Sequence, residues 1–261
     1  MNYDKLSLEF EDDFQSGELN TEKWLPFYLP QWSSQEATRP NFCFRAGQLV
    51  LKITDDQKPW SQEFNGNVKV SNLQTGVYSG PLGSKLGQHR FAKNLIVREE
   101  QPLQTTYTPQ YGYFEIRCKI PKVGIDNVFA LWMIGIEDQP NRSAEICIVE
   151  IIGAKQPKKG AKVGYGLHPF GDSQIEDEFY EDEFDLDVKD FQTYAVNWTP
   201  EFVEFFINGK KVRRVHQSPD YPMQFMLNIY EVPVPSHNPK DNTYPKEFII
   251  GYIRGYNHKI N

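Results

Sequence analysis

Two glutamates lie five residues apart in the stretch SAEICIVEII, which spans residues 143–152. The residues around them are typical of a buried β-strand, where a carboxylate is seldom left without a partner or a chemical task. In a regular strand Glu145 and Glu150 would point to opposite faces, because side chains alternate with a period of two. The apolar pattern also loses its parity here, since Val149 directly follows Ile148. The stretch therefore predicts an irregular strand.

One extra residue near Ile148 and Val149, a β-bulge, would restore both patterns. It would place Glu145, Cys147 and Glu150 on one face, and bulges often re-aim side chains beside active sites. The glutamate Cα atoms would then be about 13 Å apart. Their carboxyl groups could approach to about 5–6 Å, which is the separation in retaining glycosidases. The alternative is a pair of glutamates on the wet face of an antiparallel sheet, which parity alone leaves open.

Composition favours an all-β protein. The chain has 261 residues, 14% of them aromatic, with 18 glycines and 18 prolines. Short strands joined by many turns have this composition, whereas a helical bundle or a disordered chain does not. No apolar run approaches the roughly 18 residues of a membrane span. No internal repeat or linker is visible, so we expect one domain over residues 1–261, acting as a monomer.

The charge is concentrated in one segment. The net charge is −7. The segment from Asp172 to Asp190 contains ten Asp or Glu residues and only one Lys. An acidic chain without a basic stripe is a poor partner for nucleic acid or an anionic membrane. The segment is interpreted as a solvated loop. If it borders a site, we expect it to repel sulfated or otherwise anionic substrates.

The cysteines and the first residues indicate little about cofactors or compartment. Cys43, Cys118 and Cys147 form no C-x-x-C motif, so we expect free thiols, no zinc site and no cofactor. The first residues, MNYDKLSLEFEDDF, have neither the basic nor the apolar region of a secretory signal. The compartment stays open: the cytoplasm, or a secreted protein whose leader was removed.

Strand patterns dominate the rest of the chain. In YFEIRCKI (113–120) apolar and polar residues alternate, and FVEFFIN meets KKVRRVH through Asn208-Gly209, a strong hairpin signal. Further strands are predicted at QLVLKI (48–53), FALWMIG (129–135), FQTYAVNW (191–198), QFMLNIY (224–230) and EFIIGYIRGY (247–256). Two antiparallel sheets packed face to face as a jelly roll are the expected architecture.

The motif EICIVE resembles the E-x-D-x-x-E signature of glycoside hydrolase family 16, in its laminarinase-like branch. YGYFEIRCKIPK, FALWMIG and FQTYAVNWTPEFVEFFINGKKV also resemble family segments, so the likeness extends over nearly the whole chain. The resemblance implies a concanavalin-like β-jelly-roll sandwich with a substrate cleft on its concave sheet. It also implies a retaining endo-acting hydrolase of β-linked glucans or galactans.

Carried over to this chain, the resemblance implies that Glu145 is the nucleophile and Glu150 the general acid/base. It further implies that Glu115 and Arg117 hydrogen-bond sugars in the cleft.

Four more residues are candidates for sugar binding. Trp132 matches a family tryptophan that could stack on a sugar ring, and its alternative is packing in the core. His168 matches a family histidine that follows the catalytic strand. Alternatively, it is an ordinary histidine that is on the surface or has its hydrogen bonds made within the protein. Asn41 and Trp32, in loops before early strands, are weaker candidates.

The chain departs from the family pattern at three positions. Cys147 replaces the motif's aspartate, so a thiol stands where a carboxylate would couple to the nucleophile. It could donate its S–H to Glu145, or act as a small apolar residue. Val128 stands where the family often has another tryptophan. Gly251 replaces an aspartate that helps bind a structural calcium, which makes a calcium site doubtful.

The sequence thus predicts a retaining endo-β-glycosidase that cleaves a neutral β-glucan, most plausibly β-1,3-linked, by double displacement. Two alternatives remain: a carbohydrate-binding protein on the same fold whose catalysis is lost or weak, and a transglycosylase. The two glutamates favour an enzyme, because binding alone does not require such a pair. The expected partner is a polysaccharide or oligosaccharide.

Overall fold

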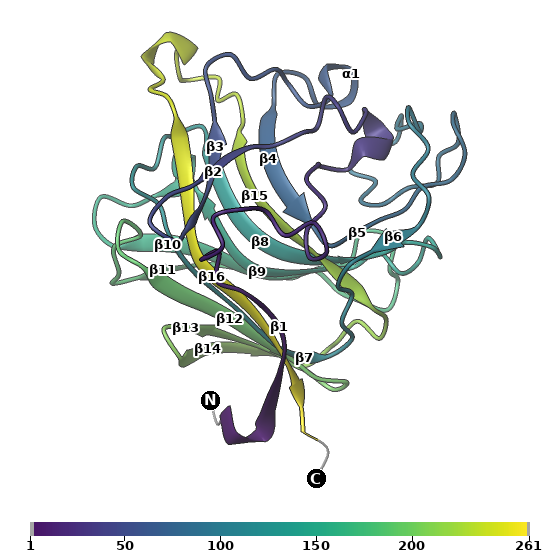
Figure 1. Cartoon of the computed structure of the whole chain (residues 1–261). Coiled ribbons are helices and arrows are strands. Elements are labelled where there is room, and N and C mark those ends of the chain that lie inside the picture. Colours follow the sequence, from purple (N-terminus) through teal and green to yellow (C-terminus); the bar gives the residue numbers. More distant parts are fainter. Residues whose placement is uncertain (1–2, 260–261) are drawn as a thin grey trace.

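Two facing layers of strands form the body of the structure (Figure 1), a computed structural model that describes residues 3–259. The strands are β1 (Leu6–Asp12), β2 (Asn41–Phe44), β3 (Leu49–Ile53), β4 (Lys69–Gln74), β5 (Gly76–Val77), β6 (Gln104–Thr105), β7 (Gly112–Lys119), β8 (Asn127–Gly135), β9 (Glu145–Ile152), β10 (Ala161–His168), β11 (Glu178–Phe184), β12 (Gln192–Trp198), β13 (Val203–Ile207), β14 (Lys210–Val215), β15 (Met223–Glu231) and β16 (Lys246–His258). The helical turns are α1 (Gln62–Asn65) and the 3-10 turns η1 (Tyr3–Lys5), η2 (Pro30–Trp32), η3 (Gly153–Lys155) and η4 (Pro239–Asp241). No helix in residues 3–259 is long and apolar enough to cross a membrane.

The strands form two main sheets. The outer sheet has the order β14-β13-β12-β7-β16-β3-β2, with β1 added alongside β16. The cleft sheet has the order β11-β10-β9-β8-β15-β4 and contains the glutamate strand β9. Neighbouring strands within each sheet run antiparallel. The predicted jelly-roll sandwich is therefore confirmed.

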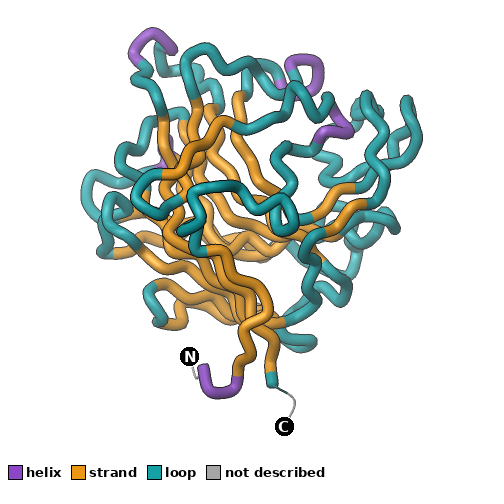
Figure 2. Tube along the Cα trace, in the orientation of Figure 1, coloured by secondary structure: helices purple, strands orange, loops and turns teal. Residues whose placement is uncertain are grey.

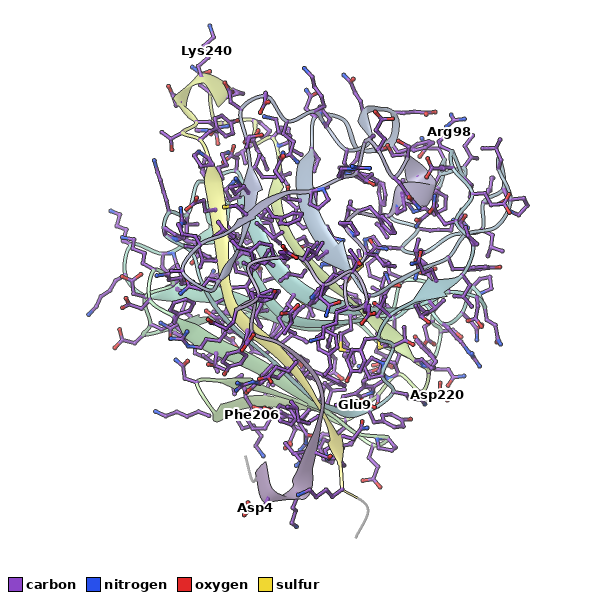
Figure 3. All side chains as sticks on the ribbon, viewed as in Figure 1. Asp4, Glu9, Arg98, Phe206, Asp220 and Lys240 are labelled. Atoms are coloured by element: carbon purple, nitrogen blue, oxygen red, sulfur yellow. The ribbon has the colours of Figure 1, made fainter. Side chains whose placement is uncertain are left out.

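Side chains fill the space between the two sheets (Figure 3). The outer sheet contributes Phe114, Ile116 and Cys118, which is the apolar face predicted from the alternation in residues 113–120. The cleft sheet contributes residues such as Leu131 and Phe225. Each such side chain stabilises the fold by roughly 1.5–3 kcal/mol on burial, before chain entropy is subtracted. This core holds the cleft sheet rigid from behind.

The strands predicted from sequence are present, and so is the hairpin between β13 and β14. At its turn Asn208 has φ 50° and Gly209 has φ 73°. Both angles lie in the left-handed region that a two-residue type I′ turn requires, and Asn-Gly tolerates it better than other pairs.

Loops cover part of the open face of the cleft sheet. Figure 2 shows long loops above and beside the strands. Tyr28, Trp60 and Leu95 from these loops pack with Ala130 and Met226 of the cleft sheet in a second apolar cluster. The loops therefore leave only part of that sheet face accessible.

Only part of the acidic segment is the solvated loop that its charge suggests, since its middle is a strand. Residues Glu178–Phe184 form β11, the edge strand of the cleft sheet. Its carboxylates have cationic neighbours, as in the 2.7 Å pair between Glu181 and Lys155. A charged edge strand is stable because it discourages pairing with other chains while its partner cations compensate its charge.

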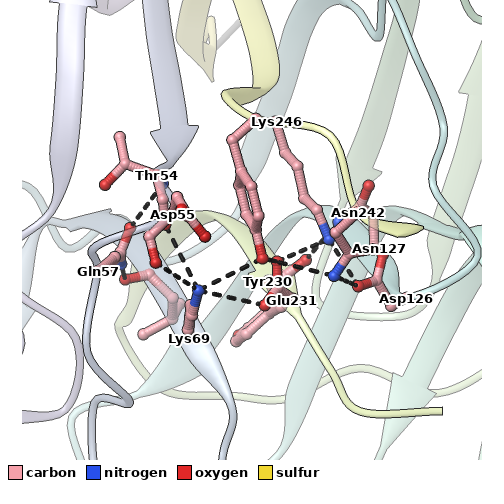
Figure 4. A network of polar contacts seen from close by, with 12 residues as sticks. Thr54, Asp55, Gln57, Lys69, Asp126, Asn127, Tyr230, Glu231, Asn242 and Lys246 are labelled. Carbon is pink, nitrogen blue, oxygen red and sulfur yellow. Dashed lines mark hydrogen bonds and ion pairs between the residues drawn. The ribbon is translucent and has the colours of Figure 1, made fainter. Parts of the chain in front are cut away.

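A buried ionic network ties the two sheets together at the end of β15 (Figure 4). Lys246, which begins β16 of the outer sheet, lies 2.6 Å from Asp126 and 2.6 Å from Glu231. Lys69 of β4 approaches Glu231 to 3.4 Å. Tyr244 donates a hydrogen bond to the same glutamate at 2.8 Å.

Candidate active site

The glutamate strand contains the predicted bulge. Along β8 and β9, Leu131 pairs with Val149 and the next residue, Trp132, pairs with Cys147. Ile148 is therefore the extra residue. Because of it, Ile148 and Val149 both belong to the core between the sheets.

The opposite face of β9 opens onto a cavity of about 350 Å³, called the cleft below. Glu145, Cys147 and Glu150 all line it. The rest of its lining is Asn65, Val68, His89, Val128, Ala130, Trp132, His168, Phe170, Tyr230 and Val232. The mixture of apolar walls and a few convergent polar groups is typical of a binding site for a small molecule or a sugar.

Two glycines of the neighbouring strand β10 lie across from the glutamate strand, and one of them leaves room for Glu150. Gly164 pairs with Glu150, and Gly166 pairs with Cys147. A Cβ atom at Gly164 would lie 3.3 Å from the Cβ atom of Glu150 and 2.7 Å from a ring atom of Phe179. The glycine therefore sets the position that Glu150 can occupy.

Burial controls the charge of the two glutamates. It raises the pKa of Glu145 well above its usual range, and the nearby charges of Glu150 and Asp177 raise it further. It raises the pKa of Glu150 to about 7, although the ammonium of Lys155 draws that pKa down. Two such coupled carboxyls hold a shared proton near neutral pH. The pair can thus provide one acid and one carboxylate.

Cys147 stays uncharged between them. Burial and then the charges of Glu150 and Glu145 raise the pKa of its thiol. The side chain is 2% exposed and packs with the cluster that contains Trp132. A third negative charge is therefore missing from this site at neutral pH.

His168 lies beside Glu145, since the two residues are cross-strand partners on β10 and β9. Its Nδ1 is 3.0 Å from an oxygen of Asp177, and its ring stacks on Phe179 with 4.6 Å between centroids. The stack and the carboxylate together fix the orientation of the imidazole. His168 thus lies in the cleft, as the sequence predicted.

Trp132 also lies in the cleft, although only 4% of it is exposed. Its ring is 4.9 Å from that of His89, which in turn is 4.7 Å from Phe170. Most of the Trp132 surface is thus used in packing, and only an edge is available to a ligand.

Among the cleft residues that sequence reasoning missed are His89 and Tyr230. Burial and the charge of His168 lower the pKa of His89 to about 4, so its ring is neutral, and its buried Nδ1 has no hydrogen-bond partner within residues 3–259. Tyr230 accompanies Tyr28, to which its hydroxyl donates a hydrogen bond at 3.2 Å. His89 lies on a loop with no periodic signal, whereas Tyr230 could have been found from the alternation along residues 224–230.

Glu115 and Arg117 are not in the cleft, and the expectation that they contact sugar there is wrong. Both belong to β7 of the outer sheet, whose inward face carries Phe114 and Ile116. They point away from the core and therefore away from the cleft sheet. The guanidinium of Arg117 instead lies 3.8 Å from the ring centroid of Phe191.

Asn41 and Trp32 are also used elsewhere. Asn41, on the edge strand β2 of the outer sheet, donates a 2.9 Å hydrogen bond to Gln57. Trp32 is fully buried, and its indole N–H donates to the carbonyl of Gln88 at 2.8 Å. Neither residue lines the cleft, because their polar groups stabilise loops.

The surroundings of Gly251 do not fit a calcium ion. A Cβ atom there would lie 3.1 Å from Nη1 of Arg117, so a guanidinium occupies the place of a ligand. A fixed positive charge at this point opposes a hard cation. No group of three or more His, Cys, Asp or Glu side chains within residues 3–259 is arranged to hold a metal ion.

Comparison with known proteins gives a consistent result. The model of glycosyl hydrolases family 16 matches residues 94–243. A β-glucanase from Acetivibrio thermocellus is 31% identical over 123 residues, which are 46% of this chain and 34% of the β-glucanase. The chain thus spans about a third of that relative.

Solved structures share the fold. The GlcNAcα1-4Gal releasing endo-β-galactosidase from Clostridium perfringens has a TM-score of 0.85 and is 30% identical, covering 97% of this chain and 63% of that one. A laminarinase catalytic domain from Thermotoga petrophila has a TM-score of 0.69 and is 20% identical, covering 98% of this chain and 99% of that one.

Proposed function

The chain belongs to glycosyl hydrolases family 16, and we propose that it is a retaining endo-β-glycosidase. The observation that carries the proposal is the bulge at Ile148, which brings Glu145 and Glu150 to one cleft. Both pKa values are raised there, and the pair shares a proton near neutral pH. A retaining glycosidase begins its reaction in this state, with one carboxylate and one carboxylic acid.

The proposed reaction has two displacements. A carboxylate oxygen of Glu145 attacks the anomeric carbon and forms a glycosyl ester, while the bond to the leaving oxygen breaks and Glu150 gives that oxygen its proton. Glu150 then takes a proton from water, whose oxygen attacks the same carbon and releases Glu145. Two inversions leave the anomeric configuration unchanged.

These roles require Glu145 to be ionised when the sugar is bound. In the free cleft, burial and charge favour the shared proton on Glu145, because Lys155 lowers the pKa of Glu150. A sugar hydroxyl that donates to Glu145 would reverse this preference, since a hydrogen bond to a carboxylate favours its charged form. Substrate binding and proton placement are thus coupled in the proposal.

Two substrate classes have support. A β-glucan is supported by the β-glucanase relative, and the β-1,3 linkage is part of this proposal. A β-galactoside is supported by the endo-β-galactosidase, which is similar across 97% of this chain. Either sugar would be neutral at the cleaved bond, because Asp177 adds a negative charge close to the glutamate pair.

The experiment compares the wild type with Glu145→Gln, Glu150→Gln and the control Glu201→Gln, an exposed residue in the turn before β13. Laminarin, mixed-linkage glucan, agarose, carrageenan and a glycan ending in GlcNAcα1-4Gal are each incubated with every protein, and new reducing ends are followed. The wild type and Glu201→Gln are expected to cut at least one of these, and both catalytic variants to lose at least about a thousandfold in rate. If the wild type only binds, the carbohydrate-binding alternative replaces this proposal.

The stereochemistry is tested separately. NMR of the first product formed should give the β-anomer, and azide should restore turnover to Glu145→Gly as an α-glycosyl azide. A first product with the α-anomer would contradict double displacement. Transfer to an added oligosaccharide in preference to water would identify the transglycosylase alternative.

A further inference from the structure

A second cavity adjoins the cleft, and the proposed function does not use it. It has a volume of about 580 Å³ and is called the basic chamber here. Its lining is Lys85, Leu86, Gly87, Arg90, Phe91, Ala92, Lys93, Glu137, Pro140, Asn141, Ser143, Phe170 and Gly171. Phe170 lines the cleft as well, so the two cavities meet at this ring.

Three cations line the chamber. Lys85, Arg90 and Lys93 are exposed, and none of them forms an ion pair with another residue in 3–259. The chamber therefore concentrates positive charge that the rest of the molecule does not neutralise.

The acid in the chamber wall does not cancel this charge. Glu137 is 4% exposed, and burial raises its pKa to about 8, although Arg90 and a hydrogen bond from the backbone N–H of His89 act in the opposite direction. Its carboxyl is largely protonated at neutral pH. The chamber thus carries a positive charge under ordinary conditions.

The loop that carries the cations is firmly attached to the fold. The carbonyl of Gln88 accepts hydrogen bonds from Gln31 at 3.0 Å and from Trp32 at 2.8 Å. The Gln88 side chain donates to Gln224 at 2.9 Å. The chamber therefore exists before any ligand arrives, which lowers the entropy cost of binding.

His89 is the point in the loop where the chain passes from one cavity to the other. Its φ of 51° is in the left-handed region, which a residue with a Cβ adopts only at a cost. Its ring contacts Trp132 and lines the cleft, whereas the next residue, Arg90, lines the chamber. One loop therefore contacts both sites at adjacent positions.

We propose that the basic chamber is a subsite for an anionic substituent, a sulfate ester or a carboxylate, on the glycan that occupies the cleft. The chamber offers Arg90, a guanidinium that can bind such a group through two N–H donors. Phe91 and Phe170, which is 44% exposed, offer apolar surface to the sugar that carries the group. The anion lies away from the cleaved bond, so it does not meet the carboxylates of the cleft. This inference rests on the proposed function, because it assigns the ligand that continues from that cleft.

Binding to matched glycans tests the proposal. The probes are laminarin with its sulfated and its 6-carboxylated derivatives, and keratan sulfate with its desulfated form. All proteins tested carry Glu145→Gln, which prevents hydrolysis. Affinity electrophoresis compares this single variant with a chamber variant that adds Arg90→Gln/Lys93→Gln. A control variant adds Lys189→Gln/Lys210→Gln instead. The control lysines are exposed, one on a turn and one in the outer sheet, and neither lines a cavity with the chamber residues.

Glu145→Gln is expected to bind at least one charged glycan at least about tenfold more tightly than its neutral form, with the difference shrinking as salt increases. The control should keep this difference, and Arg90→Gln/Lys93→Gln should lose it. The sulfated and carboxylated arms identify which anion is bound. Equal affinity for charged and neutral members, or a preference that persists in the chamber variant, would overturn the subsite.

The hydrolase proposal can fail independently of this one. Selective binding of a charged glycan that the wild type does not cut would leave the subsite in place and remove the hydrolytic function. Cleavage of neutral glycans without any selectivity for charge would do the opposite.

Discussion

At the scale of single residues, the chemistry of the cleft depends on where one proton lies between Glu145 and Glu150. Glu145 is buried and Glu150 is partly buried, and the charge of Glu150 raises the cost of ionising Glu145. Cys147 shares their face as a neutral thiol. The family signature has a carboxylate at this position, so the charge balance of this cleft differs by one acidic group.

Replacing Cys147 by Asp should therefore change the pH profile of the reaction. A third carboxylate beside Glu150 disfavours the ionised form of that acid and raises its pKa. Activity is lost at high pH when the acid loses its proton. The basic limb of the kcat/KM profile should therefore move to higher pH, by about one pH unit. Cys147→Ser, which adds no charge, is the control and should leave the limb in place. An unchanged limb in Cys147→Asp would mean that position 147 does not influence the acid.

Glu137 gives a prediction for stability. Its folded pKa of about 8 lies above the usual 4.5, so the folded state keeps a proton that the unfolded chain releases between those pH values. The free energy of unfolding of the wild type should fall as pH rises through this window. Glu137→Gln removes the titration, so it should be more stable than the wild type by roughly 2–4 kcal/mol at pH 8.5 and similar to it near pH 4. Urea unfolding at the two pH values measures this, and an equal difference at both would contradict it.

At the scale of elements, the face that carries Glu145 and Glu150 depends on two neighbouring strands, one with an extra residue and one with glycines. β9 has an extra residue, Ile148, which turns Glu150 toward the cleft. β10 has Gly164 across from Glu150, where a Cβ atom would crowd that side chain. The bulge and Gly164 are needed together, because the first aims the side chain and the second leaves it space.

Gly164→Ala tests this relation. Its backbone can accept alanine, since its φ is not in the left-handed region, yet the new Cβ would press on Glu150 and on the ring of Phe179. We expect kcat to fall about 10- to 100-fold through misplacement of the acid, with a smaller change in KM. Lys162→Ala on the same strand is the control and should keep kcat. If Gly164→Ala retains full kcat, the glycine is not setting the position of the acid.

Local patterns predicted the bulge and the hairpin because both depend on residues close in sequence. Val149 following Ile148 reveals the extra residue, and Asn208-Gly209 specifies its turn without reference to the rest of the fold. By contrast, β10 was not predicted, because Gly164 and Gly166 are poor strand formers and are retained for space.

The position of a side chain relative to the cleft was harder to predict. Alternation separated Glu115 and Arg117 from the core, but it cannot tell which of two sheets a strand joins. Their placement in the cleft came from the family resemblance alone. His89 was missed for a similar reason, since contacts of its loop with Gln31 and Trp32, more than fifty residues away, bring it to the cleft. Resemblance to a family implied the roles of the glutamates, but it also placed Glu115 and Arg117 in the cleft, whereas β7 belongs to the outer sheet.

At the scale of the whole molecule, the two sheets must stay in register for the cleft sheet to keep its curvature. The apolar core does most of this, but Lys246 adds a polar link from the outer sheet to Asp126 and Glu231. The Lys246 and Asp126 side chains are 5% and 4% exposed. One oxygen of Asp126 has no hydrogen-bond partner within residues 3–259. The buried carboxylates of Asp126 and Glu231 are therefore stable only while the Lys246 ammonium compensates their charge.

Lys246→Met tests how much the network depends on its central cation. The methionine fills similar space but leaves two carboxylates in a buried site with less compensation, so we expect a loss of about 3–5 kcal/mol in the free energy of unfolding. Arg45→Met is the control: its 2.7 Å pair with Glu247 is on the surface, with the arginine 55% exposed, and its loss should cost at most about 1 kcal/mol. Adding Asp126→Asn to Lys246→Met should recover part of the stability, because it removes one of the uncompensated charges. A loss for Lys246→Met no larger than that of Arg45→Met, in urea unfolding at pH 7, would show that the apolar core alone holds the sheets together.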